Sequence, residues 1–196
     1  YKNNTLLHTP KFEKFSKKGN EVAFGSIGDA STSEGPFWET LNAASVLEVP
    51  MVMSVWDDGF GISVQKKYQT TKASISEALK GFQKEPGTNG FEIFRVKAWD
   101  YAKLCLTYEK AVEQTRKTQT PALIHVEEVT QPQGHSTSGS HERYKSAERL
   151  QWEKEYDGIH KFKEWILAKE IATTEELEAI GMDERHRCQQ QQKSIY

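Results

Sequence analysis

Short apolar runs alternate with segments of helical periodicity along most of this chain. The runs are too short for helices and contain β-branched residues, which is typical of strands. Residues 51–56 (MVMSVW) are continuously apolar, as expected of a parallel strand covered on both faces. The expected strands are residues 21–27, 51–56, 91–96 and 122–128. The first of them is expected to be buried and to end at Gly28.

The segments between these runs are expected to be helices. After the first strand, Ser33 offers an N-cap, Pro36 suits the first helical turn, and the segment closes at Pro50. Its apolar face consists of Phe37, Leu41, Ala44 and Leu47. The other expected helices are residues 75–82 and 101–118, followed by outer helices within residues 147–168 and 174–180.

Strands that alternate with helices imply right-handed crossovers and a parallel sheet with helices on both faces. The sequence therefore predicts an α/β fold, a three-layer doubly wound parallel sheet. We expect a polar N-terminal segment at residues 1–20, an α/β domain at residues 21–168 and a C-terminal helical tail at residues 169–196. The Gly/Ser/Thr-rich stretch at residues 130–141 is too polar for the core and is expected to be an exposed loop.

Charge, hydropathy and cysteine content argue against several classes of function. The 26 Lys and Arg residues nearly balance the 28 Asp and Glu residues, so we expect no nucleic-acid partner. No apolar run approaches the roughly 18 residues of a membrane span, so no membrane association is expected. The two cysteines lie far apart without metal-ligand spacing, which favours a reducing, cytoplasmic location. The polar ends and the initial Tyr1 suggest a fragment of a longer protein.

Two acidic turns follow the first two expected strands. Asp29 comes directly after the first strand, and Asp58 comes shortly after the second. Adjacent parallel strands would bring both turns to the same edge of the sheet, where ligands of such folds gather. The helix that follows Asp29 would offer free N–H groups and a positive dipole end to a phosphate.

A carboxylate cannot itself bind phosphate, but a divalent cation can bridge the two groups. Mg²⁺ prefers oxygen ligands from carboxylates, phosphates and water. Asp29 and Asp58 are the natural carboxylate ligands, and the glycines on either side of Phe60 let the backbone turn so that the Phe60 carbonyl becomes a third. Gly-Asp and Asp-Gly are also ordinary turn dipeptides, so a purely structural role stays open at this point. No GxGxxG fingerprint and no GxxxxGK[ST] loop is present.

These motifs resemble those of one enzyme family. Residues 27–35 (IGDASTSEG), 42–44 (NAA), 49–50 (VP) and 57–63 (DDGFGIS) resemble the thiamine-diphosphate motif of 2-oxo acid dehydrogenases, in the alpha part of their decarboxylating component. Residues 134–138 (GHSTS) and 144–145 (YK) resemble that family's active-site loop. The resemblance covers about residues 21–165 and is greatest to single-chain members in which alpha and beta parts are fused.

The resemblance implies a thiamine-diphosphate-binding fold and a specific set of site residues. The metal ligands would be Asp29, Asp58 and the carbonyl of Phe60. The residues around the cofactor would be Gly28, Ala30, Ser31, Glu34, Ile62 and His135. His135 would be the loop histidine with a catalytic role, as a proton donor or a neutralising charge near the diphosphate.

Three departures from the family pattern are visible. Ala30 stands where the family has glycine, and Asp58 stands where most members have asparagine. Carboxylate and amide oxygens can occupy the same ligand position, so a metal site with Asp58 is expected to work. Gly139 and Ser140 replace the usual acidic pair of the loop, which argues against kinase regulation.

The resemblance implies oxidative decarboxylation of a 2-oxo acid and acyl transfer to a lipoyl group. It implies a beta part, a lipoyl-bearing acyltransferase and an oligomer as partners. The carboxylate that activates the cofactor comes from the beta part in this family, so the isolated chain is expected to be an inactive half-site. Two alternatives stay open from the residues alone: a Mg²⁺-dependent phosphoester hydrolase that uses Asp29 and Asp58, and a non-catalytic α/β interaction module.

Overall fold

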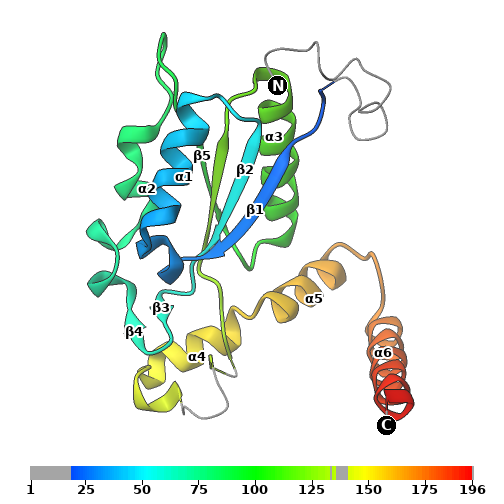
Figure 1. The fold of residues 1–196 in the computed structure, drawn as a ribbon. Coiled ribbons are helices and arrows are strands. Elements are labelled where there is room, and N and C mark those ends of the chain that lie inside the picture. The colour runs from blue at the N-terminus through cyan, green and yellow to red at the C-terminus, as the bar shows by residue number, and fades with distance from the viewer. Residues whose placement is uncertain (1–18, 133, 136–140, 196) are drawn as a thin grey trace.

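The four expected strands form one parallel sheet in the order β1-β2-β6-β5 (Figure 1). The computed structural model describes residues 19–132, 134–135 and 141–195. The strands are β1 (Ala23–Gly28), β2 (Met51–Trp56), β5 (Glu92–Lys97) and β6 (Ala122–Glu127). Their ends differ from the predicted ends by no more than a few residues, and the parallel arrangement is confirmed.

Helices cover both faces of this sheet. α1 (Gly35–Val46) and α2 (Ile75–Ala78) lie on one face, and α3 (Tyr101–Thr118) lies on the other (Figure 1). Each face has its own buried cluster, one shared by α1, α2 and the sheet and one shared by α3 and the sheet. The three-layer α/β architecture predicted from the sequence is therefore confirmed.

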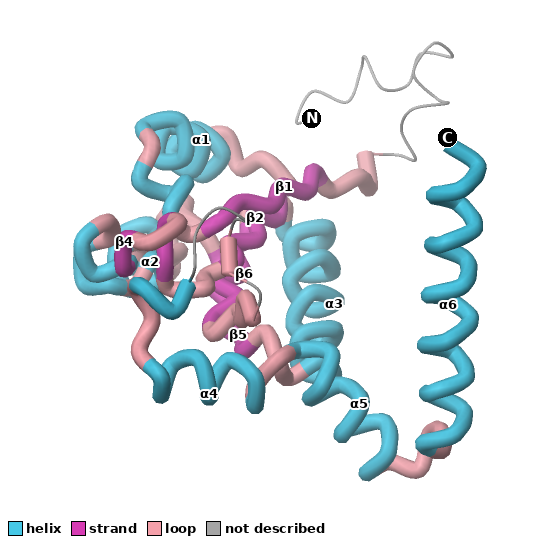
Figure 2. Tube along the Cα trace, turned by 90° about the horizontal axis from the view of Figure 1, so that it is seen from below, coloured by secondary structure: helices cyan, strands magenta, loops and turns pink. Residues whose placement is uncertain are grey.

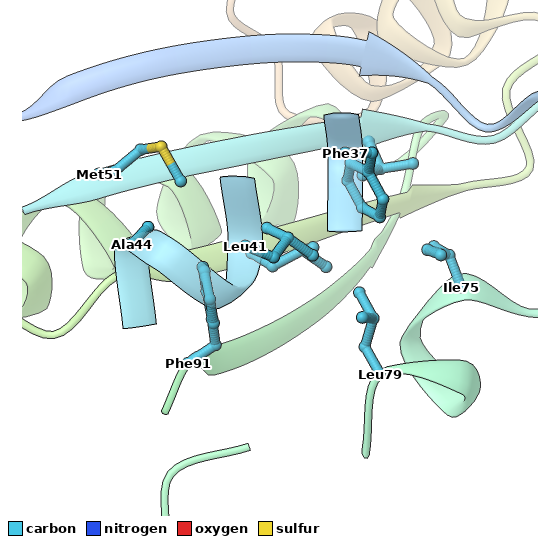
Figure 3. Packing of buried hydrophobic residues seen from close by; sticks show 9 residues of the cluster. Phe37, Leu41, Ala44, Met51, Ile75, Leu79 and Phe91 are labelled. Carbon is cyan, nitrogen blue, oxygen red and sulfur yellow. The ribbon is translucent and has the colours of Figure 1, made fainter. Parts of the chain in front are cut away.

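The larger cluster shows why α1 forms where it does (Figure 3). Phe37, Leu41 and Ala44 lie one helical turn apart and are buried against the sheet. Met51 and Val55 project from β2 into the same cluster, and Leu79 and Phe91 close it. Leu47, predicted to extend this face, is 65% exposed because the helix ends at Val46 and Leu47 is its C-cap.

Two local predictions at the first strand and helix were wrong. β1 is an edge strand that pairs with β2, and its side chains are mostly exposed rather than buried, as Phe24 at 56% shows. Ser33 does not cap α1, because Ala30–Ser33 form a short 3₁₀ helix and Glu34 takes the N-cap position. Pro36 does lie in the first turn of α1, as expected.

Short elements that the hydrophobic pattern did not indicate follow β2. β3 (Phe60–Gly61) and β4 (Val64–Gln65) form a small antiparallel hairpin, and 3₁₀ turns lead from it to α2. Such short elements contain too few residues to show a periodicity. The expected helix at residues 75–82 is α2 followed by a 3₁₀ turn at Lys80–Phe82.

The outer helices lie beyond the carboxyl ends of the strands. They are α4 (Ala147–Glu155), α5 (Gly158–Ala168) and α6 (Thr174–Ile195). Asp157 begins α5 by accepting hydrogen bonds from the backbone N–H groups of Ile159 and His160. α6 continues well past Ile180 and extends away from the sheet (Figure 2). Across the described residues, none of the helices has both the length and the apolar character for crossing a membrane.

The difference between Leu41 and Leu47 on α1 gives a test of this packing. Leu41→Ala is expected to lower the free energy of unfolding by about 3 kcal/mol, because it leaves a cavity in the core. Leu47→Ala removes the same atoms from an exposed position and is expected to change stability by less than about 0.5 kcal/mol. Urea unfolding of both variants measures the difference, and equal effects would contradict the position assigned to α1.

Candidate functional site

The parallel pairing of β1 with β2 brings the two acidic turns to one edge of the sheet. Gly28 and Trp56 are register partners at the ends of these strands. The Asp29 N–H donates a 3.0 Å hydrogen bond to the Trp56 carbonyl, and the Asp57 N–H donates a 2.8 Å bond to the Val126 carbonyl. Asp29 and Asp58 therefore follow neighbouring strand ends, as the sequence predicted.

A cavity of about 380 Å³ lies at this edge. Most of the predicted site residues line it: Gly28, Asp29, Ala30, Ser31, Asp58, Phe60, Ile62 and His135. Glu34 is not among the lining residues; it is exposed at the N-cap of α1. Four further lining residues were not predicted: Trp56, Gly61, Val129 and Gln131. The position of Trp56 at the last place of its strand was the one signal that could have indicated it.

The departure at Ala30 is accommodated by Gly61 from the β3–β4 hairpin. A Cβ atom at Gly61 would come within 2.9 Å of the Ala30 methyl, so a side chain at residue 61 would collide with it. At Gly28 a Cβ would meet no atom within 4 Å. The Ala30 methyl therefore packs against a backbone that has no side chain.

Asp29 is buried in an unusual electrostatic environment. Its residue is 6% exposed, and its Oδ2 finds no hydrogen-bond partner among the described residues. Burial, together with the smaller effect of the nearby charges of Asp57 and Asp58, raises the pKa of Asp29 to about 7. A buried carboxylate whose Oδ2 has no partner among the described residues, beside two other carboxylates, is unfavourable in its charged form unless a positive charge compensates for it.

Asp57 has a different role, because it already has cationic and hydrogen-bonding partners. Its Oδ2 accepts from Lys66 Nζ at 2.7 Å and lies 2.9 Å from His125 Nε2. Burial alone would raise the pKa of Asp57, but these bonds outweigh it and lower the pKa to about 2. The other ring nitrogen of His125 lies 2.9 Å from Ser76 Oγ, so this fully buried histidine has partners on both sides.

Asp58 belongs to a tight turn that aims toward the cavity. Burial raises the pKa of Asp58, against a hydrogen bond from the Phe60 amide and the charge of Lys145. The Phe60 N–H donates to Asp58 Oδ1 at 3.0 Å, and Gly59 between them has φ +84°. The positive φ favours glycine at this position.

The described residues at this edge offer only a few oxygen donors to a cation. Among the described residues, no group of three or more His, Cys, Asp and Glu side chains is arranged to hold a metal ion. The available donors are the carboxylates of Asp29 and Asp58 and backbone carbonyls such as that of Phe60. A cation with few protein ligands that completes its shell with phosphate and water oxygens fits Mg²⁺.

The loop after β6 reaches the cavity at His135, which is exposed. Residues 136–140, which include the serine-rich motif and the positions of Gly139 and Ser140, lie outside the described residues. After them, Tyr144 and Lys145 contact Phe60: the Tyr144 ring lies 5.7 Å from the Phe60 ring, and Lys145 Nζ lies 5.3 Å from it. The motif at residues 57–63 and the motif at residues 144–145 therefore meet at Phe60.

The raised pKa of Asp29 predicts a pH dependence of stability without metal. The folded state holds the proton up to about pH 7, whereas an unfolded Asp loses it near 3.8, so Asp29 lowers stability progressively as the pH rises between these values. Asp29→Asn removes this loss and is expected to be about 1–2 kcal/mol more stable than the parent above pH 7, after allowance for solvent screening. Urea unfolding in the presence of a chelator, from pH 4.5 to 8, measures the stability of both proteins. If the stability of Asp29→Asn and that of the parent changed in parallel with pH, the raised pKa of Asp29 would be contradicted.

Comparison with known proteins gives a consistent result. The family model described as "Dehydrogenase E1 component" matches residues 7–195. The pyruvate dehydrogenase E1 component subunit alpha of Rickettsia typhi is 25% identical over 161 residues, which are 82% of this chain and 47% of that protein. The 2-oxoisovalerate dehydrogenase subunit alpha 1 of Arabidopsis thaliana is 32% identical over 155 residues, 78% of this chain and 31% of that protein. The pyruvate dehydrogenase E1 component subunit alpha of Porphyra purpurea is 31% identical, over 79% of this chain and 42% of that protein. The chain thus spans less than half the length of these relatives.

Proposed function

The chain belongs to the dehydrogenase E1 component family, and we propose that it is the diphosphate- and Mg²⁺-binding half of a thiamine-diphosphate-dependent 2-oxo acid dehydrogenase. The observation that carries this proposal is the pair Asp29 and Asp58 at the ends of two adjacent parallel strands, lining one cavity. The resemblance of the motifs and the names of the relatives support the same assignment.

The residues at this edge fit a magnesium diphosphate. The unpartnered Oδ2 of Asp29 supplies a buried anionic ligand that has no other use in the described structure. Asp58 supplies the second carboxylate, and the Phe60 carbonyl supplies a neutral oxygen. Gly28, Ala30 and Ser31 line the same cavity and would face the diphosphate, with Ile62 beside them. Glu34 lies outside this group, which leaves it with the capping position of α1.

Bound thiamine diphosphate supplies the electron sink that decarboxylation of a 2-oxo acid requires. The contribution of this chain would be to bind and orient the cofactor's diphosphate and to neutralise its charge. Asp29 and Asp58 would hold a cation that offsets the diphosphate charge, and the exposed His135, which lines the cavity, would offer a proton or a positive charge. Asp29 and Asp58 are both buried, so electrostatic interactions at this edge are stronger than they would be in bulk water.

The partners follow from the same proposal. A beta part, fused or separate, would complete the cofactor site and provide the activating carboxylate, so this chain alone would be inactive. The acyl group would pass to a lipoyl-bearing acyltransferase. A cofactor held between two parts requires at least one pair, and closed symmetry favours a two-plus-two oligomer. We place this enzyme in the cytoplasm.

Substitution of the two carboxylates tests the proposal directly. In the complete protein with its beta part, Asp29→Ala and Asp58→Ala are expected to weaken Mg²⁺-dependent thiamine-diphosphate binding by at least about tenfold, because each removes a charged ligand. Asp58→Asn keeps an oxygen ligand and is expected to stay close to the parent. Isothermal titration at saturating Mg²⁺ gives the affinities.

Asp183→Ala is the matched control, since Asp183 is an exposed aspartate on α6, away from the sheet. Unchanged affinity in both Asp29→Ala and Asp58→Ala would overturn the proposal. Mg²⁺-dependent release of phosphate from p-nitrophenyl phosphate, with no need for thiamine diphosphate, would instead favour the hydrolase alternative. Failure to bind the cofactor with the beta part present would favour an interaction module.

A further inference from the structure

We propose that Arg149 of α4 is a positioning residue for the turn Asp58–Gly59–Phe60, which presents two of the proposed cation ligands. Arg149 lies far along the chain from this turn and is not among the residues that line the diphosphate cavity. It lines a second cavity together with Asp58, Gly59 and Phe60. The inference rests on the proposed function for the identity of the cation, but its geometric part stands on contacts within the described chain.

Arg149 holds the turn at both ends. Its Nη2 donates a 2.8 Å hydrogen bond to the Asp58 carbonyl oxygen. Its guanidinium carbon lies 5.5 Å from the centre of the Phe60 ring, within the range of a cation–π interaction. One planar group therefore fixes the backbone of one proposed ligand and the side chain of the other.

The carbonyls around this turn show why a side chain is needed there. The Asp57 carbonyl accepts from the backbone N–H of Val129, and the Gly59 carbonyl accepts from the backbone N–H of Lys66, each at 2.9 Å. Between them, the Asp58 carbonyl accepts from the Arg149 side chain. Of three successive carbonyls, the middle one thus depends on a donor that substitution can remove. Without it, the peptide after Asp58 is free to rotate and to turn the Asp58 carboxylate and the Phe60 carbonyl away from a shared ion.

Arg149 is itself fixed by an ion-pair network around the buried Glu153 of the same helix, to which Lys145 contributes from just before the helix. Its Nε donates to Glu153 Oε1 at 2.8 Å, one helical turn along α4. Glu153 is fully buried, and both of its oxygens accept from Lys145 Nζ at 2.8 Å. A buried carboxylate satisfied by two cations holds a defined geometry, because any movement leaves a charge unpaired in a medium of low polarity. The guanidinium is therefore presented to the turn in one orientation.

Mn²⁺ serves as the probe of the cation site, because its binding is followed directly by electron paramagnetic resonance. In the complete protein with its beta part and saturating thiamine diphosphate, Arg149→Gln is expected to weaken Mn²⁺ binding about tenfold, as loss of a charge-assisted hydrogen bond implies. Arg149→Lys keeps the charge but cannot bridge Glu153 and the Asp58 carbonyl with one planar group, so an intermediate affinity is expected. Lys154→Gln is the matched control: it removes the same charge from an exposed position of α4.

Hydrogen exchange of the metal-free protein gives a readout that needs no cofactor. Arg149→Gln is expected to speed the exchange of the Phe60 amide, which donates to Asp58 Oδ1 in the turn, and Lys154→Gln is expected to leave it unchanged. Thermal unfolding checks that both variants fold, which is expected since the Arg149 side chain is 29% exposed and Glu153 keeps Lys145.

The outcomes separate the two proposals. Weaker Mn²⁺ binding together with faster exchange in Arg149→Gln alone supports the positioning role. Parent-like Mn²⁺ affinity and exchange in Arg149→Gln overturn it. If the parent protein binds no Mn²⁺ with thiamine diphosphate, the proposed function and the cation role of the turn both fail, and faster exchange in Arg149→Gln would then show a structural role only.

Discussion

The close approach of buried carboxylates at the ends of two parallel strands is the constraint on which the site depends. Because Gly28 and Trp56 are register partners, Asp29 and the Asp57–Asp58 pair follow directly after neighbouring strand ends. The protein pairs Asp57 with Lys66 and His125, whereas Oδ2 of Asp29 has no partner among the described residues and the pKa of Asp29 rises to about 7. A fold tolerates such a charge when a ligand compensates for it, because desolvation of an unpaired carboxylate costs several kcal/mol. The cation proposed for this site would supply that compensation.

The other half of the site comes from a segment that the strands do not determine. α4 lies after the loop that follows β6, and its Arg149 reaches back to the carbonyl of Asp58. The network of Lys145, Arg149 and Glu153 is local in sequence. It can contact the turn at Asp58 because α4 packs beside the β3–β4 hairpin (Figure 1). The turn Asp58–Gly59–Phe60 is thus held from two directions, by the sheet through the preceding Asp57 and by α4 through Asp58.

Much of the fold could be predicted from periodicity. The predictions that failed concern burial and element ends, which depend on neighbouring elements rather than on the pattern within one segment. β2 and α3 begin and end where the pattern placed them. β1 was expected to be buried, but the burial of a strand depends on the elements beside it. In the described sheet β1 pairs with β2 alone, and most of its residues are exposed. Leu47 continues the apolar spacing of α1 although the helix has already ended. At the site, the motifs indicated Asp29, Asp58 and Phe60, whereas Trp56, Val129 and Arg149 belong to no motif and were missed.

The sequence by itself determined which local structures form and which ligand atoms are available. Apolar spacing depends on side-chain direction within one element, and turn chemistry depends on neighbouring residues, so both are encoded locally. The tertiary structure alone decided which carboxylate is paired by cationic and hydrogen-bonding groups and which keeps an unpaired oxygen among the described residues. That outcome depends on distances between His125, Lys66 and the aspartates, which come from separate parts of the chain and meet only when the sheet has formed.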